Sequence, residues 1–418
     1  MTEKLYDNGH LREFDATVVS CVRSERVPAG AEPSAGGQDV YEVVLDRTAF
    51  FPEGGGQFAD QGTLGDSAVL DVQLISTESD GESIVHYVDA PLPEGAAVHG
   101  VLDWDLRFRR MQEHSGEHIV SGLVCSTFGC RNIGFHLGDD DTTCDYNMAL
   151  TEEQVRDIEA RANAVVFANL PVTVSYPDPA VLPDLDYRAK LDLTENVRLV
   201  TIEGVDVCAC CAPHVSHTGE IGLIKITNFE KAHGGTRLHL RCGRNALEDY
   251  QEKQSNIQRI MDLCSAPQAE TAAAVQQLTE ANGSLKHELS VTQVKVAEAY
   301  LSALPAEPVD GSLVLYLPDA DTDTLRALCN GGREKCTGLS VALTNAAPLS
   351  AGQEPDSFRY MITAADGRPL SKLAKTYNEA LHGRGGGHDD MLQGAFGATL
   401  SKIRAYFVEA DGNNPKMA

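Results

Sequence analysis

The sequence predicts a multidomain protein of the α+β class. Its 418 residues exceed the usual size of one hydrophobic core, so two or three domains are expected. Hydrophobic residues make up 42% and charged residues 23% of the chain, which is typical of globular proteins. Short strand patterns dominate the N-terminal quarter, and helical patterns alternate with strands after it. The composition shifts indicate four parts, at residues 1–104, 105–245, 246–304 and 305–418.

Residues 1–104 are expected to form a small β-barrel. Short runs of strand-forming residues alternate there with clusters of Gly, Pro, Asp and Ser. After one run, the chain enters a turn that contains Gly54, Gly55 and Gly56, where missing Cβ atoms let the backbone approach a ligand. An ordinary hairpin loop has the same composition. The strands are expected at residues 17–22, 40–45, 69–75, 84–88 and 96–104.

Residues 105–245 combine helices and strands in one α+β domain. A helical pattern covers 106–128, and an irregular segment follows it. A second helix is expected over 152–169, because Pro171 ends the pattern. Strand-like segments follow at 172–175, 197–202 and 221–226.

Residues 246–304 are expected to form a helical linker. Apolar residues fall at a and d heptad positions, Asn282 occupies one a position, and Pro267 separates two helices. A helical hairpin and a coiled coil between two chains fit equally well, so a homodimer through this part is one expected assembly. The heptad residues are Val275, Leu278, Leu285, Leu289, Val296 and Ala299.

Residues 305–418 are expected to form a small α/β domain, which could also hold two chains together. Strands are expected at 313–317, 339–344 and 358–363, with helices at 322–330 and 370–381. The glycine run at 383–387 lacks the Gly-Lys-Ser/Thr ending of a phosphate-binding loop, so nucleotide hydrolysis is not implied.

The net charge of −27 argues against indiscriminate binding to nucleic acid or to an anionic membrane. The N-terminal segment lacks the features of a secretory signal, and no apolar run reaches membrane-spanning length. We therefore expect a cytoplasmic protein that has no membrane partner. Its eleven cysteines are scattered along the chain, which favours thiols or metal ligands over a disulfide framework.

Two short segments together predict a metal site. His114 and His118 lie one turn apart on a predicted helix, so both imidazoles share one face. Cys210 and His214 can converge in a short turn. This mixture of imidazole and thiolate ligands favours Zn²⁺ over Mg²⁺ or Ca²⁺, whereas core histidines with inert cysteines are the alternative. Cys208 and Cys211 are rival ligands.

Such a site has more than one use. An open coordination position would let zinc activate water or anchor a substrate, whereas a closed site would be structural. The segment from His114 to His118 also matches the H-x-x-E-H pattern of inverted-zincin metallopeptidases, with Glu117 as the base. That alternative requires a carboxylate ligand from a later helix, for which Glu152 and Glu159 are candidates.

Four sequence blocks resemble the alanyl-tRNA editing proteins in their long form, which are related to the editing half of alanyl-tRNA synthetase. Residues 45–57 are similar to the LDRT-x-F-Y-P-x-x-GGQ block, and 109–118 resemble the R-x-M-Q-x-H-(T/S)-x-x-H block. Residues 210–214 match the C-x-x-x-H position, although Pro213 replaces the usual Thr before the histidine. Residues 385–394 resemble the glycine-rich end of the accessory domain.

The resemblance implies hydrolysis, in trans, of alanine tRNA that carries serine or glycine. It implies Zn²⁺ bound by the His114, His118, Cys210 and His214 side chains. We expect Thr48 or Gln57 to supply a polar contact, because an apolar pocket separates serine from alanine poorly. Glu117 could accept a proton, although a solvent-exposed position on the helix is the ordinary expectation.

Aminoacylation is not expected, because the sequence begins at the editing barrel. Contacts with tRNA are expected from the glycine turn at 54–56, from Arg109, and from two basic segments at 221–246 and 368–404. The first segment contains Lys225 and Arg237, and the second contains Arg384. The alternative from a different class is a zinc-stabilised tRNA-binding protein that lacks catalysis.

Overall fold

The computed structural model describes residues 2–25, 39–77, 81–138, 141–189, 196–347 and 355–409. Contacts within the chain form two compact units, Met1–Gln258 and Arg259–Ala418. Each unit combines helices with its own sheets, which confirms the multidomain α+β class. The finer division into four parts stays a prediction.

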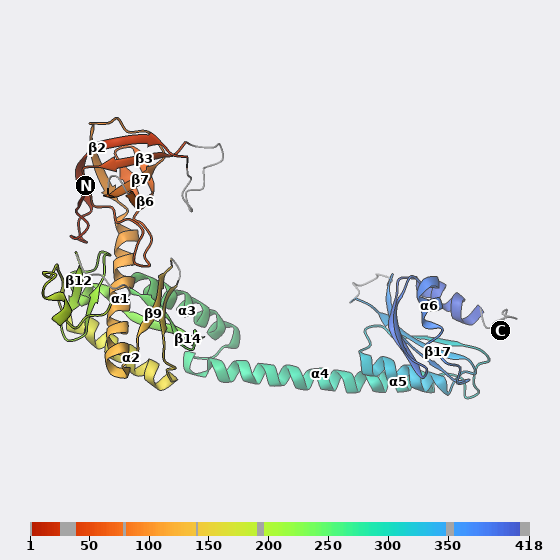
Figure 1. Ribbon diagram of the computed structural model, residues 1–418. Coiled ribbons are helices and arrows are strands. Elements are labelled where there is room, and N and C mark those ends of the chain that lie inside the picture. Colours follow the sequence, from red (N-terminus) through yellow and green to blue (C-terminus); the bar gives the residue numbers. More distant parts are fainter. Residues whose placement is uncertain are drawn as a thin grey trace. The chain divides into compact units, whose positions relative to one another are not determined.

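The first unit opens with a closed barrel of six strands in the order β2-β3-β7-β6-β5-β8 (Figure 1). The expected barrel is therefore confirmed. Alternate residues of β2, among them Phe14, Ala16 and Val18, point into the barrel core, as the two-residue period of a strand requires. The barrel strands are β2 (Glu13–Arg23), β3 (Tyr41–Leu45), β5 (Gly62–Leu64), β6 (Ser67–Thr77), β7 (Gly81–Val88) and β8 (Ala97–Leu102), while β1 (Glu3–Lys4) pairs with β4 (Arg47–Thr48).

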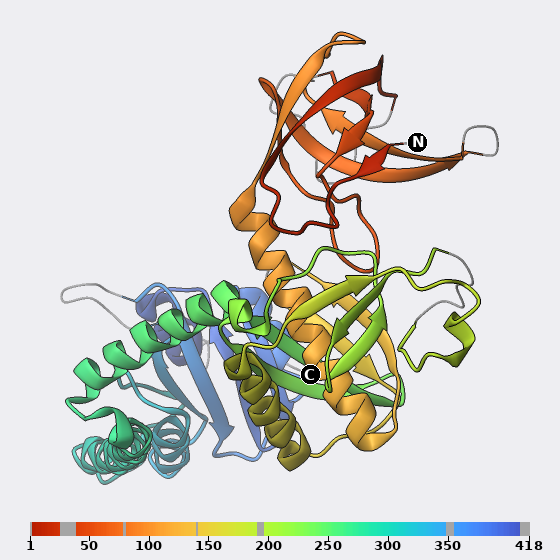
Figure 2. The ribbon, with the colours of Figure 1, turned by 90° about the vertical axis from the view of Figure 1, so that its left-hand side faces the viewer.

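A long helix, α1 (Trp104–Phe128), leads from the barrel into the rest of this unit (Figures 1 and 2). Its first turn is capped by the Asp103 carboxylate, and it ends at Gly129, which has a left-handed φ of 65°. The fully buried Arg107 guanidinium forms an ion pair with Asp60 of the barrel. Removing one partner of a buried pair typically costs about 3–5 kcal/mol, so this pair fixes α1 against the barrel.

Two sheets and a second helix pack around α1. The segment after α1, expected to be irregular, instead forms a hairpin of two strands that joins a four-stranded sheet in the order β14-β15-β10-β9. The expected strand at 221–226 begins at Ile224, after a short 3₁₀ turn. The elements are α2 (Glu152–Ala168), β9 (Asn132–Leu137), β10 (Thr142–Tyr146), β14 (Ile224–Ala232), β15 (Gly235–Cys242), the three-stranded sheet of β11 (Val172–Ser175), β12 (Leu199–Ile202) and β13 (Asp206–Ala209), and the 3₁₀ turns η1 (Leu182–Asp184) and η2 (Thr218–Ile221).

Two helices span the predicted linker. Helix α3 (Gly243–Cys264) is separated from α4 (Thr271–Ser302) by Pro267 and the 3₁₀ turn η3 (Gln268–Glu270), so the expected break is confirmed. Five of the heptad side chains on α4 are between 45 and 64% exposed. Their pairing, in a hairpin or between two chains, stays a prediction. These residues are Val275, Leu278, Leu285, Leu289 and Val296.

The second unit contains a five-stranded sheet in the order β16-β17-β18-β20-β19. The expected helix at 370–381 covers only Ala374–Ala380, and the glycine run forms the edge strand β19 (Arg384–His388). Among the described residues, no helix combines the length and apolar character that crossing a bilayer requires. The other elements are β16 (Leu313–Tyr316), α5 (Thr322–Arg333), β17 (Leu339–Asn345), β18 (Phe358–Ala364), α6 (Ala374–Ala380), β20 (Met391–Phe396), α7 (Leu400–Arg404) and the final turn η4 (Ala405–Glu409).

Candidate metal centre

Four predicted metal ligands converge in the first unit. The side chains of His114, His118, Cys210 and His214 each offer one ligand atom, and these atoms lie within 4.8 Å of one another. The two α1 histidines are 2% exposed and His214 is 6% exposed, so the cluster is shielded from bulk water. Segments almost a hundred residues apart in the chain thus form one group that could hold a cation.

The Cys210 thiol faces two of the imidazoles. Its Sγ lies 3.5 Å from Nε2 of His114 and 3.4 Å from Nε2 of His214. The rings of His118 and His214 lie with their centroids 4.5 Å apart, which places the third imidazole against the same group. One thiol and three imidazoles form a borderline donor set of the kind that suits zinc.

The outer nitrogens of two histidines are held by neighbouring side chains. His114 donates from Nδ1 to Oε1 of Gln57, at 2.9 Å. His214 has its Nδ1 3.0 Å from the Ser115 hydroxyl, which also accepts a hydrogen bond from the Val215 amide. Such contacts hold the ring orientation and leave Nε2 of each ring as the ligand atom.

The third histidine is backed by a carboxylate. His118 Nδ1 lies 3.1 Å from Oδ2 of Asp206, and both side chains are 2% exposed. Arg188 donates to the two oxygens of Asp206, at 2.6 and 2.7 Å. The Arg188 and His118 contacts lower the pKa of Asp206 despite its burial, so the carboxylate stays ionised behind the imidazole.

The two rival cysteines occupy different places. Cys208 forms a second group with His118 and Asp206, but Arg188 already neutralises that carboxylate. Cys211 is exposed, and it faces the glycine turn rather than the cluster, since its Sγ is 3.4 Å from where a Cβ of Gly55 would lie. Cys210 is therefore the thiol best placed to be a ligand.

The glycine turn brings Gln57 to the cluster. Gly54 and Gln57 bond to each other across the turn at 3.0 Å, and Gly56 has a φ of 84°. A Cβ at Gly56 would lie 2.7 Å from the Phe135 ring, so only glycine allows this approach. The Gln57 side chain is 1% exposed, and its Nε2 has no hydrogen-bond partner among the described residues.

Thr48 is fully buried inside the barrel. His86 Nδ1 donates to the carbonyl oxygen of Val43 at 3.1 Å, so its Nε2 must accept the Thr48 hydroxyl hydrogen at 2.8 Å. The Thr48 oxygen also accepts from the Phe50 amide. Burial lowers the pKa of His86 to about 4, which keeps the ring neutral at pH 7.

Glu117 does not lie on a solvent-exposed face, contrary to the ordinary expectation. It is 4% exposed, and its Oε1 accepts hydrogen bonds from Asn132, at 2.7 Å, and from Ser121. The sequence pattern did not indicate this, because α2, β13 and β15 pack around α1 and every residue from Arg110 to Val124 is buried. The two carboxylates that the metallopeptidase alternative could use as ligands are not part of the cluster. Glu152 pairs with Arg156, and Glu159 pairs with Lys225.

Three of the four basic side chains that are expected to contact tRNA form ion pairs with acidic side chains. Arg109 forms an ion pair with Glu248, Lys225 binds Glu159 at 2.6 Å, and Arg237 binds both oxygens of Asp145. Exposed ion pairs contribute at most about 1 kcal/mol, so phosphates could displace them. Arg384 is exposed on β19 and has no ion pair among the described residues.

The donor set fits a divalent cation. Burial and the neighbouring Cys211 raise the pKa of the Cys210 thiol, and burial with the other two imidazoles lowers the pKa of His214. A neutral imidazole is the form that binds a metal, and a buried thiol becomes a thiolate when a cation is bound. The residues present are therefore suited to binding a cation.

Comparisons with known proteins agree with this architecture. The family described as "tRNA synthetases class II (A)" matches residues 2–106, and "Threonyl and Alanyl tRNA synthetase second additional domain" matches residues 197–261. The chain is 30% identical to the alanyl-tRNA editing protein Aarsd1 of Mus musculus, over 93% of this chain and 92% of that protein. The chain belongs to the alanyl-tRNA editing protein family.

Other members of this family align over similar lengths. Aarsd1 of Danio rerio is 30% identical over 92% of this chain and 91% of its own length. The alanyl-tRNA editing protein AlaX-L of Pyrococcus horikoshii is 27% identical over 97% of this chain and 99% of its own. The resemblance inferred from the four sequence blocks is therefore confirmed.

Some residues of the site were not predicted from the sequence. Ser115, Arg188 and Asp206 surround the predicted ligands, and His86 lies behind Thr48. Ser115 lies between the two α1 histidines in the sequence, so its position in the motif could have indicated that it belongs to the site. Arg188 and Asp206 had no such signal, because their pairing depends on backbone hydrogen bonds between Arg188 and β13.

Proposed function

We propose that this chain hydrolyses the ester of alanine tRNA that carries serine or glycine. The reaction takes place in trans at a zinc ion held by His114, His118, Cys210 and His214. Membership of the alanyl-tRNA editing family supports the substrate class, because relatives along most of the chain bear that name. We expect the hydrolase to work in the cytoplasm, where charged tRNA is used.

One observation carries the proposal. The predicted ligands come from α1 and from the loop after β13, and their four ligand atoms lie within 4.8 Å of one another. Two of the imidazoles are oriented from behind by Gln57 and Ser115, and the third by Asp206. When zinc is bound there, it can polarise an ester carbonyl, lower the pKa of a water molecule or anchor the substrate amine.

Gln57 has the best geometry for a direct contact with substrate. Its Oε1 is engaged by His114, which turns the amide so that the Nε2 donor is free of partners among the described residues. A donor in a water-poor site stabilises negative charge that develops on an ester oxygen. We propose that Gln57 donates a hydrogen bond to the substrate carbonyl or to the serine hydroxyl.

Thr48 and Glu117 are proposed to act less directly. The Thr48 hydroxyl hydrogen is taken by His86, so Thr48 can offer only an acceptor to a serine hydroxyl. Glu117 accepts hydrogen bonds from Ser121 and Asn132, and a proton transfer to it would compete with those contacts. The glycine turn is proposed to line the path of the acyl group.

A deacylation assay tests the proposal. Purified protein is incubated with seryl-tRNA and with alanyl-tRNA, each with and without a chelator, and the remaining ester is measured over time. We expect loss of the seryl ester alone, with the loss abolished by the chelator and restored by stoichiometric Zn²⁺. A metal analysis of the same preparation should give one transition ion per chain.

Two outcomes would contradict this function. Hydrolysis of both esters at equal rates would remove the editing specificity. Binding of tRNA without any ester loss would instead favour the alternative, in which the metal only stabilises a tRNA-binding protein.

A further inference from the structure

The aromatic ring of Phe135, on β9, lies beside the metal centre. Its ring centre is 4.8 Å from that of His114, and the two planes are tilted by 40°. Phe135 belongs to the hairpin β9–β10, whereas the four proposed ligands come from α1 and from the loop after β13. A phenyl ring has no atom that binds a metal, so Phe135 can act on a substrate only by its shape and its apolar surface.

The same ring packs against the glycine turn. A Cβ at Gly56 would lie 2.7 Å from a ring carbon of Phe135 and 3.0 Å from its carbonyl oxygen. The next residue of the turn, Gln57, holds His114 through its Oε1, and its Nε2 has no partner among the described residues. Phe135 therefore contacts both neighbours of the Gln57 amide, and an acyl group that reaches this amide meets the ring.

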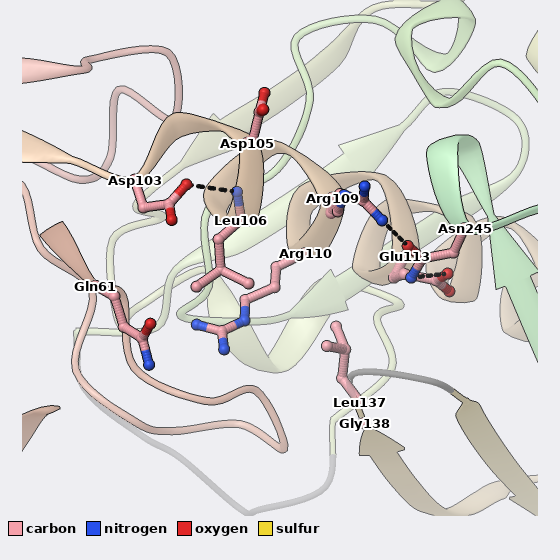
Figure 3. Close-up of a pocket in the computed structure, with 10 residues that line it drawn as sticks. All are labelled: Gln61, Asp103, Asp105, Leu106, Arg109, Arg110, Glu113, Leu137, Gly138 and Asn245. Carbon is pink, nitrogen blue, oxygen red and sulfur yellow. Dashed lines mark hydrogen bonds between the residues drawn. The ribbon is translucent and has the colours of Figure 1, made fainter. Parts of the chain in front are cut away.

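The backbone on both sides of Phe135 is held in place. Gly134 has no room for a side chain, because a Cβ there would lie 2.9 Å from a carboxylate oxygen of β10. Leu137 is 2% exposed, and its amide donates to a carbonyl oxygen of the glycine turn at 3.0 Å. Figure 3 shows Leu137 and, on α1, Arg110 at the wall of a cavity of about 390 Å³. Moving the ring aside would therefore disturb the pairing of β9 and its packing against α1.

Exposure to solvent differs between this ring and the metal ligands beside it. Phe135 is partly exposed, and Gly55 and Gly56 of the turn are exposed, whereas His114 and His118 are almost fully buried. An acyl group that comes from the solvent beside the glycine turn therefore meets the Phe135 ring before it reaches the buried histidines.

A ring that is fixed in this way limits the size of the group beside it. Serine and threonine both carry a hydroxyl group, and threonine adds one methyl group, so a hydrogen bond to the hydroxyl does not separate them. One methyl group too many or too few typically changes kcat/KM by about 10–200-fold in a packed site. Threonine is therefore the residue that isolates the effect of size.

We propose that Phe135 limits the acyl group at the metal centre to the size of serine, and that its ring excludes threonine and larger residues by steric contact. The inference rests on the proposed function and deepens it, because it names the acyl groups that the same site rejects. Phe135 then sets the upper limit of size, whereas a hydroxyl contact with Gln57 or Thr48 separates serine from alanine.

Binding and cleavage by the full-length, zinc-loaded chain test this role. The probes are 3′-deoxy-3′-(seryl)aminoadenosine and its threonyl counterpart, whose amides resist hydrolysis. Phe135→Leu keeps an apolar contact with His114 but removes the ring, and Phe135→Ala removes this contact as well. Ile133→Ala is the matched control, because Ile133 lies on the same strand and is 50% exposed. Zinc content and the absorption spectrum of the Co²⁺-loaded chain report whether the metal ligands are undisturbed.

We expect the wild type to bind the seryl probe about tenfold or more tightly than the threonyl probe. Both Phe135 variants should reduce this ratio several-fold through tighter binding of the threonyl probe, and Ile133→Ala should keep the wild-type ratio. With the corresponding tRNA esters, kcat/KM for the threonyl ester should rise in both variants, while kcat/KM for the seryl ester changes less. A purely structural role would weaken binding of both probes alike and leave their ratio unchanged.

The two hypotheses fail differently. If the wild type deacylates seryl-tRNA but the ratio of probe affinities is the same in the wild type and in folded, zinc-loaded Phe135 variants, the size limit is overturned and the function stands. If the wild type deacylates neither ester but the variants lose the preference for the seryl probe, the function fails and the size limit stands. A Phe135→Ala chain that does not fold leaves Phe135→Leu to decide.

Discussion

At the residue scale, the amide of Gln57 combines two contacts that one substitution can separate. Its Oε1 orients His114, and its Nε2 has no hydrogen-bond partner among the residues that the structure describes. Gln57→Glu keeps an acceptor for His114 but replaces the donor with an oxygen. The two contacts therefore predict different effects, on metal binding and on ester cleavage.

We expect Gln57→Glu to lower kcat for seryl-tRNA by about 10²–10³, the usual effect of losing one donor to a developing charge. Zinc content should stay near one ion per chain, because His114 keeps its acceptor. Single-turnover deacylation and metal analysis on the same preparation measure both. An unchanged kcat would remove Gln57 from the role of a donor to substrate.

His86 predicts an acid sensitivity of the barrel. Its pKa falls from the ordinary 6.5 to about 4 in the folded chain because the ring is fully buried. Between these values the unfolded chain takes up a proton that the folded chain does not, so stability falls as pH drops from 6.5 to 4. The penalty reaches about 3 kcal/mol at and below pH 4.

The variant His86→Gln should lose this part of the pH dependence. Chemical unfolding at pH 7.5 and pH 4.5, compared between wild type and variant, measures it. His287→Gln is the control, since His287 is exposed on α4. An equal acid destabilisation of wild type and His86→Gln would show that the ring is protonated in the fold.

At the scale of single elements, the segment from β13 to the following loop supplies both ligands and their support. Asp206 begins β13, and Cys210 and His214 follow it in the loop. Arg188 reaches Asp206 because its own backbone pairs with Val207 and Ala209. The carboxylate is thereby held behind His118, on the side opposite the cluster.

Asp206→Asn should weaken zinc binding by about 10–100-fold, the usual effect of losing a carboxylate behind a histidine ligand. Competition with a chromogenic chelator gives the affinity, and the absorption spectrum of a Co²⁺-loaded chain reports the ligand geometry. Asp184→Asn, in the exposed turn η1, should change neither. Wild-type affinity and spectrum in Asp206→Asn would contradict a supporting role.

The elements differ in how well the sequence predicts them, for physical reasons. The helices α1 and α2 were predictable because their caps and apolar periods are local, as with Thr151 and Asn169 at the ends of α2. The hairpin β9–β10 was missed because it carries glycine and acidic residues, and its stability comes from pairing with β15. The edge strand β19 was hidden by its glycines, two of which are required because a Cβ at Gly385 or Gly387 would lie 2.4 or 2.1 Å from a carbonyl oxygen of β20.

The site shows the same division. His114 and His118 were predictable from a spacing of one turn, and the Cys210 turn from its own sequence. The partners Asp206 and Arg188 depend on contacts between β13 and the backbone of Arg188, which lies before β12, and the sequence has no local signal for them.

At the scale of the whole molecule, the charge distribution limits how tRNA can bind. A chain with a net charge of −27 attracts RNA only where basic side chains gather. Lys225 and Arg237 of the first unit are paired with carboxylates, whereas Arg384 of the second unit has no acidic partner among the described residues. Much of the affinity for tRNA is therefore expected to come from the second unit.

A chain that ends at Cys264 separates the two contributions. It retains the barrel, α1 and the whole metal cluster, so we expect one zinc ion per chain and unchanged cleavage of a seryl ester on a short acceptor hairpin. Its affinity for full-length tRNA should fall, and the slope of log affinity against log salt should shrink by roughly one for each phosphate that the second unit binds. Filter binding across a salt series measures both quantities. A full-length Arg384→Ala variant is the matched comparison, because it removes one charge and leaves the fold of the second unit unchanged. If the shortened chain kept the full slope, the phosphates would be bound by the first unit, and the expected contribution of the second unit would be contradicted.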